Sequence, residues 1–457
     1  MDSIKWDKEV DALVVGSGAG GMSAALTASV EGLDVLLVEK TGHIGGSTAI
    51  SGGALWIPLN AQTDAAGHPD SFDKVWTYLQ ETVGAAASDD MKRAYLQAGP
   101  RMMDDLVERG FLQVAARTAS PDYYPDRPGA ALGGRSLDPV EFDGRKLGRH
   151  FKTLRDPLKE FTVLGGMMVN ITDVRHLLRA TRAFTSWRHA MKLVLRYYTD
   201  RLRGYHRGTR LLLGNALAAQ LFHALLSRNI PYWLDTPALG LVRGDDGAVL
   251  GVTVMRQGRQ MSIRARRGVV LATGGFPWDS ARRQQAYPHP TGDWSMSPRD
   301  NTGDGIRMAE GAGAALGQGH CSPAFWAPVS ILEQPGRAPL HYPHLVWDRA
   351  KPGLIAVNGA GRRFVNESTS YHAFVEAMYR SHADTPTVPA YLLCDQRFID
   401  TWGLGLALPG GRPRQHLIDA GYLLQAPTLQ ALAQKLGVPA DALAATGATI
   451  AFDATGG

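Results

Sequence analysis

The chain has 457 residues, 44% of them hydrophobic, and a formal net charge of +5 at pH 7. This length allows two or three domains with large cores. The modest positive charge comes without a block of like charges, which argues against a nucleic-acid partner. Two cysteines, Cys321 and Cys394, form neither a disulfide framework nor a metal motif, so we expect a cytoplasmic protein without a metal site. No apolar signal core opens the chain, and no segment has the roughly 18 apolar residues of a membrane-spanning helix.

A glycine-rich motif near the N-terminus is the strongest signal in the sequence. The apolar run 12–15 predicts a buried parallel strand, and the run 22–30, rich in alanine and leucine, predicts a helix. Between them, Gly16, Gly18 and Gly21 have the spacing of a dinucleotide-binding turn. Gly16 would allow the tight turn, Gly18 the approach of a pyrophosphate, and Gly21 close packing of the helix. The alternative is a glycine turn of a flavodoxin-like fold that binds no nucleotide.

An acidic residue and a second glycine-rich loop decide which dinucleotide we expect. A second strand is predicted over 34–38, and Glu39 follows at the usual place of a ribose-binding acid. The loop 40–53 then continues without a gap. A nicotinamide enzyme does not need such a loop, whereas an FAD enzyme does, because its chain runs on along the flavin. We therefore predict FAD as the cofactor.

The segment from Glu39 to Gly53 resembles the fumarate reductase and 3-ketosteroid dehydrogenase flavoproteins through its pattern E-K-x-x-x-x-G-G-S-T-x-x-S-G-G. The resemblance implies an α/β fold. It would have a Rossmann-like FAD-binding domain of the two-dinucleotide-binding-domain type and an α+β substrate-capping domain. In covalent members of the family, a histidine at the position of Ser47 is bonded to the flavin. The resemblance therefore implies non-covalent FAD.

The middle of the chain is expected to be a helical insertion, about 70–207, in the FAD-binding domain. Helices with polar faces are predicted over 70–112, and several basic amphipathic helices over 155–207. The stretch 188–203 mixes leucine, valine and tyrosine with arginine and lysine. Such a face is usually solvated, and peripheral contact with a membrane surface is the alternative. A buried helix is predicted over 211–226.

The second half of the chain returns to the FAD-binding domain and then leaves it. A hairpin is predicted over 242–254, and the strand and glycine turn at 264–276 resemble the element that rejoins the FAD-binding domain in the family. We expect that domain to span 1–287. Residues 288–445 resemble the capping domain; a helix is predicted over 306–314, and strands over 354–357, 363–365 and 390–395. Residues 446–457 would begin the return to the FAD-binding domain. In the family, a last strand, a glycine turn and a closing helix follow, so the resemblance implies a truncated chain without the C-terminal catalytic groups.

The predicted FAD-binding residues come from the three glycine-rich segments, the acid and lysine at 39–40, and the start of the helix near 306. They are Gly16, Gly18, Ala19, Gly20, Gly21, Glu39, Lys40, Gly45, Gly46, Ser47, Thr48, Ser51, Gly52, Gly53, Ala272, Thr273, Gly274 and Asp304.

Two tyrosines are the candidate catalytic residues. The segment before Tyr371 resembles the family's R-F-V-N-E segment, which enters the active site. At this position fumarate reductases have an arginine as proton donor, whereas ketosteroid dehydrogenases have a tyrosine. A free tyrosine has a pKa near 10, so a tyrosine base needs help from a neighbour. Tyr123 matches the family's second tyrosine, with Tyr124 as the less favoured register. Ordinary packed tyrosines are the alternative, and His289 and His320 are weaker candidates for substrate contact.

The resemblance implies an enzyme that desaturates a small hydrophobic 3-ketosteroid next to its ketone. Hydride would pass from C1 to the flavin N5, and Tyr371 would take the C2 proton, with Tyr123 assisting. Three alternatives stay open: desaturation at C4–C5, reduction of a fumarate-like α,β-unsaturated acid, and an FAD-binding fragment without turnover. Tyr371 counts against the acid, since small dicarboxylates need arginine clamps.

Overall fold

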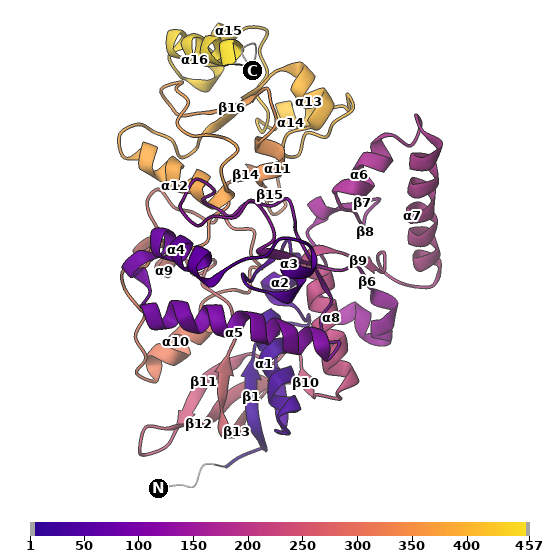
Figure 1. Cartoon of the computed structure of the whole chain (residues 1–457), viewed down its shortest axis with the longest axis vertical. Coiled ribbons are helices and arrows are strands. Elements are labelled where there is room, and N and C mark those ends of the chain that lie inside the picture. The colour runs from indigo at the N-terminus through magenta and orange to yellow at the C-terminus, as the bar shows by residue number, and fades with distance from the viewer. Residues whose placement is uncertain (1–4, 454–457) are drawn as a thin grey trace. The chain divides into compact units, whose positions relative to one another are not determined.

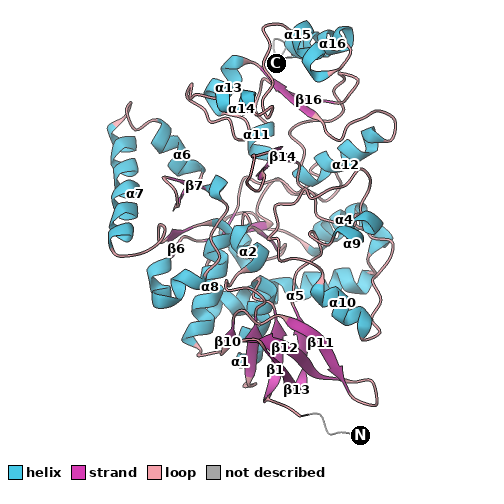
Figure 2. Ribbon diagram, turned by 180° about the vertical axis from the view of Figure 1, so that it is seen from behind, coloured by secondary structure: helices cyan, strands magenta, loops and turns pink. Residues whose placement is uncertain are grey.

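The computed structural model describes residues 5–453, which form two compact units (Figures 1 and 2). Unit 1 comprises Met1–Asp122, Arg127–Asp279 and Ser297–His320. Unit 2 comprises Tyr123–Asp126, Ser280–Met296 and Cys321–Gly457. The two units therefore interleave along the chain. The functional domain limits drawn from the sequence, 1–287 and 288–445, remain a prediction.

A six-stranded sheet forms the centre of unit 1, in the order β10-β2-β1-β13-β12-β11. Its strands are β1 (Lys8–Val15), β2 (Val35–Val38), β10 (Tyr232–Trp233), β11 (Ala238–Arg243), β12 (Val249–Arg256) and β13 (Arg259–Leu271). The first four strands in this order pair in parallel, whereas β12 and β11 add an antiparallel hairpin. The predicted strands at 12–15 and 34–38 and the predicted hairpin are confirmed. The predicted return strand is also confirmed, because β13 pairs in parallel with β1.

Two predicted helices, α1 (Ala19–Val30) and α8 (Leu213–Ser227), pack against each other in the core of unit 1. Side chains of both helices join residues of β1 and β2 in one buried cluster, for example Met22, Leu37 and Phe222. Each large apolar side chain removed from water contributes about 1.5–3 kcal/mol. This cluster therefore holds the glycine-rich start of α1 firmly against the sheet.

Besides α8, the segment between β2 and β10 combines helices with short strands, and the helical insertion drawn at about 70–207 remains a prediction. Its helices are α2 (Gly46–Ile50), α3 (Ala61–Ala65), α4 (Phe72–Thr82), α5 (Asp89–Glu108), α6 (Ile171–Leu178) and α7 (Phe184–Leu202). Its short strands are β3 (Leu55–Trp56), β4 (Val114–Ala116), β5 (Ser136–Pro139), β6 (Phe142–Asp143), β7 (Thr162–Val163), β8 (Met167–Met168) and β9 (Arg210–Leu211). Several helices were predicted within 155–207, and the structure has two α-helices there, α6 and α7, and one short 3-10 turn at Lys159–Phe161.

Unit 2 combines short helices with two small antiparallel sheets, β14–β15 and β16–β17. Its strands are β14 (Val329–Leu332), β15 (Leu340–Pro343), β16 (Leu354–Val357) and β17 (Tyr391–Cys394). Its helices are α9 (Ser280–Ala286), α11 (Val346–Arg349), α12 (Tyr371–His382), α13 (Gln396–Trp402), α14 (Gln415–Asp419), α15 (Leu429–Leu436) and α16 (Ala440–Asp453). The predicted helix near 306 is α10 (Asp304–Gly311), which belongs to unit 1. The predicted strands over 354–357 and 390–395 are confirmed.

The strand predicted over 363–365 is wrong, because only an isolated bridge joins Val357 to Arg363. The Asn358 side chain accepts hydrogen bonds from the N–H groups of Ala360 and Arg362, which keeps this segment in a tight turn. The side chain of Arg363 donates to the Glu367 carboxylate, four residues further along the same segment. The predicted return segment over 446–457 ends outside the described residues.

Candidate active site

Three glycine-rich loops leave the same edge of the sheet in unit 1. The parallel strands β1, β2 and β13 end at Val15, Val38 and Leu271. The predicted cofactor loops, 16–21, 40–53 and 272–274, begin directly after these strands. The carboxyl edge of a parallel sheet is where open α/β folds bind their ligands. The structure therefore brings the predicted FAD-binding segments to one place.

The three glycines of the first turn differ in what a side chain at each position would contact. Gly16 has φ +107°, and a Cβ there would lie 2.3 Å from the carbonyl oxygen of Ala272. A Cβ on Gly21 would lie 1.9 Å from the Gly16 oxygen. Both glycines are therefore required by the fold itself. A Cβ on Gly18 would meet only Thr48 Oγ1, at 3.7 Å, so the space beside Gly18 is open to a ligand.

The start of α1 offers backbone donors at this turn. Gly18 is the N-cap and supplies no side chain. The N–H of Met22 donates to the Gly18 oxygen, so the N–H groups before it precede the first bond of the helix. Of these, the N–H of Ala19 donates to Thr48 Oγ1 at 3.0 Å. The helix N-terminus thus provides the donors and the positive dipole end that bind phosphates in nucleotide folds.

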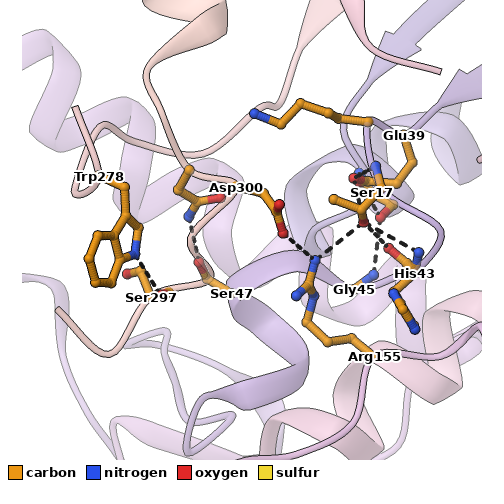
Figure 3. Close-up of polar contacts among 12 residues, drawn as sticks. Ser17, Glu39, His43, Gly45, Ser47, Arg155, Trp278, Ser297 and Asp300 are labelled. Carbon is orange, nitrogen blue, oxygen red and sulfur yellow. Dashed lines mark hydrogen bonds and ion pairs between the residues drawn. The ribbon is translucent and has the colours of Figure 1, made fainter. Parts of the chain in front are cut away.

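Glu39 organises the loops around the turn (Figure 3). One of its oxygens accepts the Ser17 N–H at 3.0 Å and the Ser17 hydroxyl at 2.6 Å. The other accepts the Thr41 N–H at 3.0 Å and the Thr41 hydroxyl at 3.1 Å. Ser17 Oγ also accepts the N–H of Gly45 at 3.0 Å. Sequence analysis missed Ser17, although it lies inside the glycine motif, because the motif pattern leaves that position open.

Residues of the 300–304 segment meet the 40–48 loop. Asn301 Nδ2 donates to Ser47 Oγ at 2.8 Å (Figure 3). Lys40 Nζ donates to Asp304 Oδ2 at 2.6 Å and to Thr302 Oγ1 at 3.1 Å. Partial burial opposes ionisation of Asp304, but the bond and charge of Lys40 outweigh it and lower the pKa of this carboxyl. Two separate sets of bonds therefore hold this segment to the loop: one joins Lys40 and Asp304 with the unpredicted Thr302, and the other joins Ser47 to the unpredicted Asn301.

Arg155 is a further polar group that the sequence did not single out. Its Nη2 donates to Thr41 Oγ1 at 3.2 Å and to Asp300 Oδ2 at 3.1 Å (Figure 3). Its Nε is buried and has no hydrogen-bond partner among residues 5–453. A buried donor without a partner costs free energy. Together with the open space beside Gly18, this donor is consistent with a polar ligand at these loops.

The rest of the second loop is shaped by its own glycines. Gly45 has φ +114° and is the N-cap of α2, which contains Gly46 and Thr48. The N–H of Gly53 donates to Ser51 Oγ at 3.0 Å. A Cβ on Gly53 would lie 2.5 Å from the Gly214 nitrogen at the start of α8. The loop therefore follows α8 closely. A Cβ added to Gly52, in the same loop, would have no neighbour within 4 Å.

The two predicted catalytic tyrosines contact each other in unit 2. The hydroxyls of Tyr123 and Tyr371 are hydrogen-bonded to each other, and their rings cross edge to face with centroids 5.3 Å apart. Phe325 packs against both rings, with centroids 5.4 Å from Tyr123 and 6.2 Å from Tyr371. Its side chain is 68% exposed. Tyr371 is also the first residue of α12, where the helix dipole favours negative charge.

A buried arginine fixes the chain just before Tyr371. Arg349 has no exposed surface, and its guanidinium donates to the carbonyl oxygens of His344, Glu367 and Thr369 at 2.9, 2.7 and 3.2 Å. The same guanidinium lies 4.3 Å from the Phe374 ring centroid on α12. Burial lowers the pKa of Arg349 to about 10, which still leaves it charged at neutral pH. Nothing in the sequence around Arg349 indicated this role.

The segment that carries Tyr123 is tied to α12 by a second set of bonds. The Tyr124 hydroxyl donates to Glu376 Oε2 at 2.9 Å, so Tyr123, and not Tyr124, meets Tyr371. His372 accepts the Trp326 N–H on Nδ1 at 3.1 Å, and its Nε2 lies 3.3 Å from Glu376. Burial lowers the pKa of His372, in keeping with a neutral ring. The weaker candidates His289 and His320 are exposed, and no group of three metal-ligating side chains occurs among residues 5–453.

The chain is similar to known flavoproteins over nearly all of its length. The FAD binding domain family matches residues 11–454. A 4-oxocyclohex-2-ene-1-carboxylate 5-dehydrogenase of Sinomonas cyclohexanicum is 35% identical and aligns with 97% of this chain and 75% of that protein. A 3-oxosteroid 1-dehydrogenase of Mycobacterium tuberculosis is 36% identical, covering 96% and 77%.

A solved structure is also similar. The crystal structure of 3-ketosteroid delta1-dehydrogenase from Sterolibacterium denitrificans, in complex with 1,4-androstadiene-3,17-dione, superimposes with a TM-score of 0.83. The two sequences are 36% identical, and the alignment covers 96% of this chain and 78% of the chain in that crystal structure. These similarities confirm the predicted α/β flavoprotein fold and FAD as the cofactor.

Proposed function

This chain belongs to the FAD binding domain family of flavoprotein oxidoreductases, and we propose that it introduces a 1,2 double bond beside the ketone of a 3-ketosteroid. The observation that carries the proposal is the hydroxyl contact between Tyr123 and Tyr371. Desaturation next to a ketone needs a base for one proton. A tyrosine can act as that base when a neighbour stabilises its anion.

The reaction removes a hydride from C1 and a proton from C2. The electron pair of the broken C2–H bond becomes the second bond between C1 and C2. Bound FAD supplies the hydride acceptor, its N5. Tyr371 takes the proton on its phenolic oxygen. The Tyr123 hydroxyl donates a hydrogen bond to that oxygen and so stabilises the phenolate that must exist before proton transfer.

The residues of unit 1 would hold the cofactor. The turn 16–21 and the start of α1 would bind the pyrophosphate. Glu39 would bind the ribose: each of its oxygens accepts one backbone N–H and one rotatable hydroxyl, so ribose hydroxyls can replace the side-chain donors. The loop 40–53 would follow the flavin half, with Ser47 unable to form the covalent bond made by a histidine.

Support for a steroid comes from the relatives and from the setting of the tyrosines. A 3-oxosteroid 1-dehydrogenase and a solved 3-ketosteroid delta1-dehydrogenase are each 36% identical to this chain. Phe325, exposed beside both tyrosines, suits the apolar face of a fused ring system. Desaturation at C4–C5 and reduction of a fumarate-like acid have weaker support. We also propose a cytoplasmic location, in keeping with the two cysteines.

A second substrate has a specific observation in its favour. The dehydrogenase of Sinomonas cyclohexanicum that acts on 4-oxocyclohex-2-ene-1-carboxylate is 35% identical, nearly as similar as the steroid enzymes. Its reaction is also a desaturation in a ring that carries a ketone. The smaller substrate has a carboxylate, which would need a cationic partner that a steroid does not need.

The test supplies the protein with 4-androstene-3,17-dione and an artificial electron acceptor. We expect 1,4-androstadiene-3,17-dione to form. The acceptor should take up two electrons for each molecule of product. The same assay with 4-oxocyclohex-2-ene-1-carboxylate should give a much lower kcat/KM. Faster turnover of the carboxylate would replace the steroid proposal with the second one, and turnover of neither would refute both.

A further inference from the structure

The residue directly before Tyr123 is a buried acid that the proposed reaction does not use. The side chain of Asp122 is 2% exposed. One of its oxygens accepts the indole N–H of Trp56 at 2.8 Å. The other accepts the N–H of Ala131 at 2.9 Å and Nη1 of Arg135 at 2.7 Å. All these donors belong to unit 1, so Asp122 is held from several sides at the point where the chain runs on into Tyr123.

Arg135 is itself fixed by a second acid. Its Nε and Nη2 donate to the two oxygens of Asp70 at 2.7 and 3.0 Å, which leaves Nη1 for Asp122. Arg135 is buried, and burial opposes its charge, but the two carboxylates outweigh this effect and raise its pKa. The planar guanidinium sets the directions of all three bonds. A buried ion pair often adds no more stability than apolar side chains of the same size. What this one supplies is a defined geometry.

The donors to Asp122 stand on a small sheet. Trp56 lies in β3, Arg135 directly precedes β5, and the two strands pair antiparallel with Trp56 opposite Ser136. The N–H of Ile57 also donates to the Arg135 carbonyl at 2.9 Å. Because the indole and the guanidinium belong to paired backbone segments, Asp122 cannot shift without losing one of its donors.

Asp122 also closes the loop that follows it. Its N–H donates to the Ala131 carbonyl at 2.9 Å, and the Ala131 N–H returns to its carboxylate. Residues 122–131 therefore form a compact loop with joined ends. Near the end of this loop, Gly129 lies directly on α4, because a Cβ there would be 2.3 Å from the Lys74 carbonyl oxygen. The loop is thus anchored at both ends within unit 1.

The proposed reaction needs the Tyr123 hydroxyl at the phenolic oxygen of Tyr371. A hydrogen bond weakens steeply when its geometry departs from the ideal. Consecutive Cα atoms are about 3.8 Å apart, so fixing Asp122 fixes where Tyr123 begins. We propose that Asp122 is a positioning residue whose bonds keep the Tyr123 hydroxyl on Tyr371. This inference rests on the proposed function and adds that the help given by Tyr123 depends on an acid whose two oxygens are both bonded within unit 1.

The test is a double-mutant cycle between Asp122→Asn and Tyr123→Phe. The amide has one acceptor oxygen, so one set of donors to residue 122 loses its partner. In rapid mixing with saturating 4-androstene-3,17-dione, we expect Asp122→Asn to slow flavin reduction by about tenfold, as the loss of one hydrogen bond would. FAD content and the dissociation constant of the steroid should not change. In the Tyr123→Phe background, Asp122→Asn should change the rate by less than about twofold, because the hydroxyl that it positions is gone.

A milder variant and a matched control complete the cycle. Trp56→Phe removes one donor to Asp122 and keeps an aromatic ring; it should show the same pattern with a smaller loss, even if Asp122→Asn folds poorly. Asp173→Asn is the control, since Asp173 is a buried acid of unit 1 that accepts a bond from Arg210 at 2.7 Å. It should reduce its flavin like the wild type and lose the usual factor when Tyr123→Phe is added.

Hydrogen exchange gives a readout that needs no substrate. The N–H of Ala131 is bonded to the carboxylate of Asp122, so Asp122→Asn should raise the exchange rate of this amide by about tenfold. Asp173→Asn should leave it unchanged. Mass spectrometry of a peptide that covers 120–132 measures the difference.

Three results would overturn the inference: flavin reduction in Asp122→Asn within about twofold of the wild-type rate, an equal loss with and without the Tyr123 hydroxyl, or unchanged exchange at Ala131. An equal loss in both backgrounds would mean that Asp122 acts on the fold and not through Tyr123. Failure of the proposed function appears in the wild type alone, as flavin that the steroid does not reduce. Failure of this inference appears only when the variants are compared with an active wild type.

Discussion

The hydroxyls of Tyr123 and Tyr371 are hydrogen-bonded to each other across a sequence separation of 248 residues. Each tyrosine is held by its own neighbours. The residue after Tyr123 is bonded to Glu376, and the carbonyls just before Tyr371 are bonded to buried Arg349. A pair fixed in this way can share one proton with little rearrangement.

Tyr123→Phe removes a hydroxyl that only stabilises the anion of its partner. We expect the rate of flavin reduction by a 3-ketosteroid to fall by about tenfold. This factor corresponds to about 1.4 kcal/mol, which is within the usual range for the loss of one hydrogen bond. Rapid-mixing measurements of flavin reduction check this result. A rate identical to that of the wild type would show that Tyr123 does not assist.

Arg349→Met should destabilise the protein. The change leaves two buried carbonyl oxygens, those of His344 and Glu367, and the partly buried carbonyl oxygen of Thr369 without their donor. We expect the free energy of unfolding to fall by about 3–5 kcal/mol, since each unsatisfied buried acceptor costs roughly 1–3 kcal/mol and part of the segment can relax. Urea unfolding measures this difference. Arg362→Met is the control, because Arg362 is exposed on the same segment and its loss should cost little. Equal effects of the two variants would contradict the role of Arg349.

Gly18→Ala separates cofactor binding from folding. A Cβ at this position meets only Thr48 Oγ1, at an ordinary 3.7 Å, so the apoprotein should unfold at the same temperature as the wild type. The methyl group would instead occupy space needed by the pyrophosphate, and FAD affinity should fall at least about tenfold. Titration of the apoprotein with FAD gives the dissociation constant. Gly99→Ala, in α5, is the control, because its Cβ would make only ordinary contact with Ile57. Unchanged FAD affinity in Gly18→Ala would remove Gly18 from the cofactor site.

The FAD should be bound without a covalent bond. Ser47 stands where covalent relatives are expected to have a histidine, and its hydroxyl accepts a hydrogen bond from Asn301. Precipitation of the holoprotein with acid should release all the yellow colour into the supernatant. Flavin that stays with the precipitate would require another residue as the point of attachment.

The parts of the site that residue patterns alone could predict are local ones, whereas the distant pair Tyr123 and Tyr371 was predicted only through the family resemblance. Gly16, Gly18 and Gly21 act within one turn, and their spacing alone indicates it. Glu39 follows β2 directly, so its place at the sheet edge could be expected. In contrast, Arg349 acts on carbonyls 18 and 20 residues away, and a carbonyl leaves no mark in the sequence.

Two further features depended on tertiary structure. The run 363–365 resembled a strand because it is short and partly apolar, but the turn at Asn358 leaves it without a strand partner. The basic helices near 188–203 were recognised as amphipathic, yet their sequence has apolar residues on two faces. Only burial distinguishes Leu193, which packs inwards, from Leu195, which is exposed.

The most direct test of the account is Tyr371→Phe. This change removes one hydroxyl from the first residue of α12 and should leave packing and FAD binding intact. The control Tyr379→Phe removes a second hydroxyl from the same helix, one that donates to the Pro290 carbonyl. Loss of a general base typically costs about 10²–10⁴-fold in rate, mainly in kcat. We predict such a loss in the rate of flavin reduction by 4-androstene-3,17-dione for Tyr371→Phe, with Tyr379→Phe close to the wild type. If Tyr371→Phe reduces its flavin within a few-fold of the wild-type rate, Tyr371 is not the base and the proposed reaction at this site is contradicted.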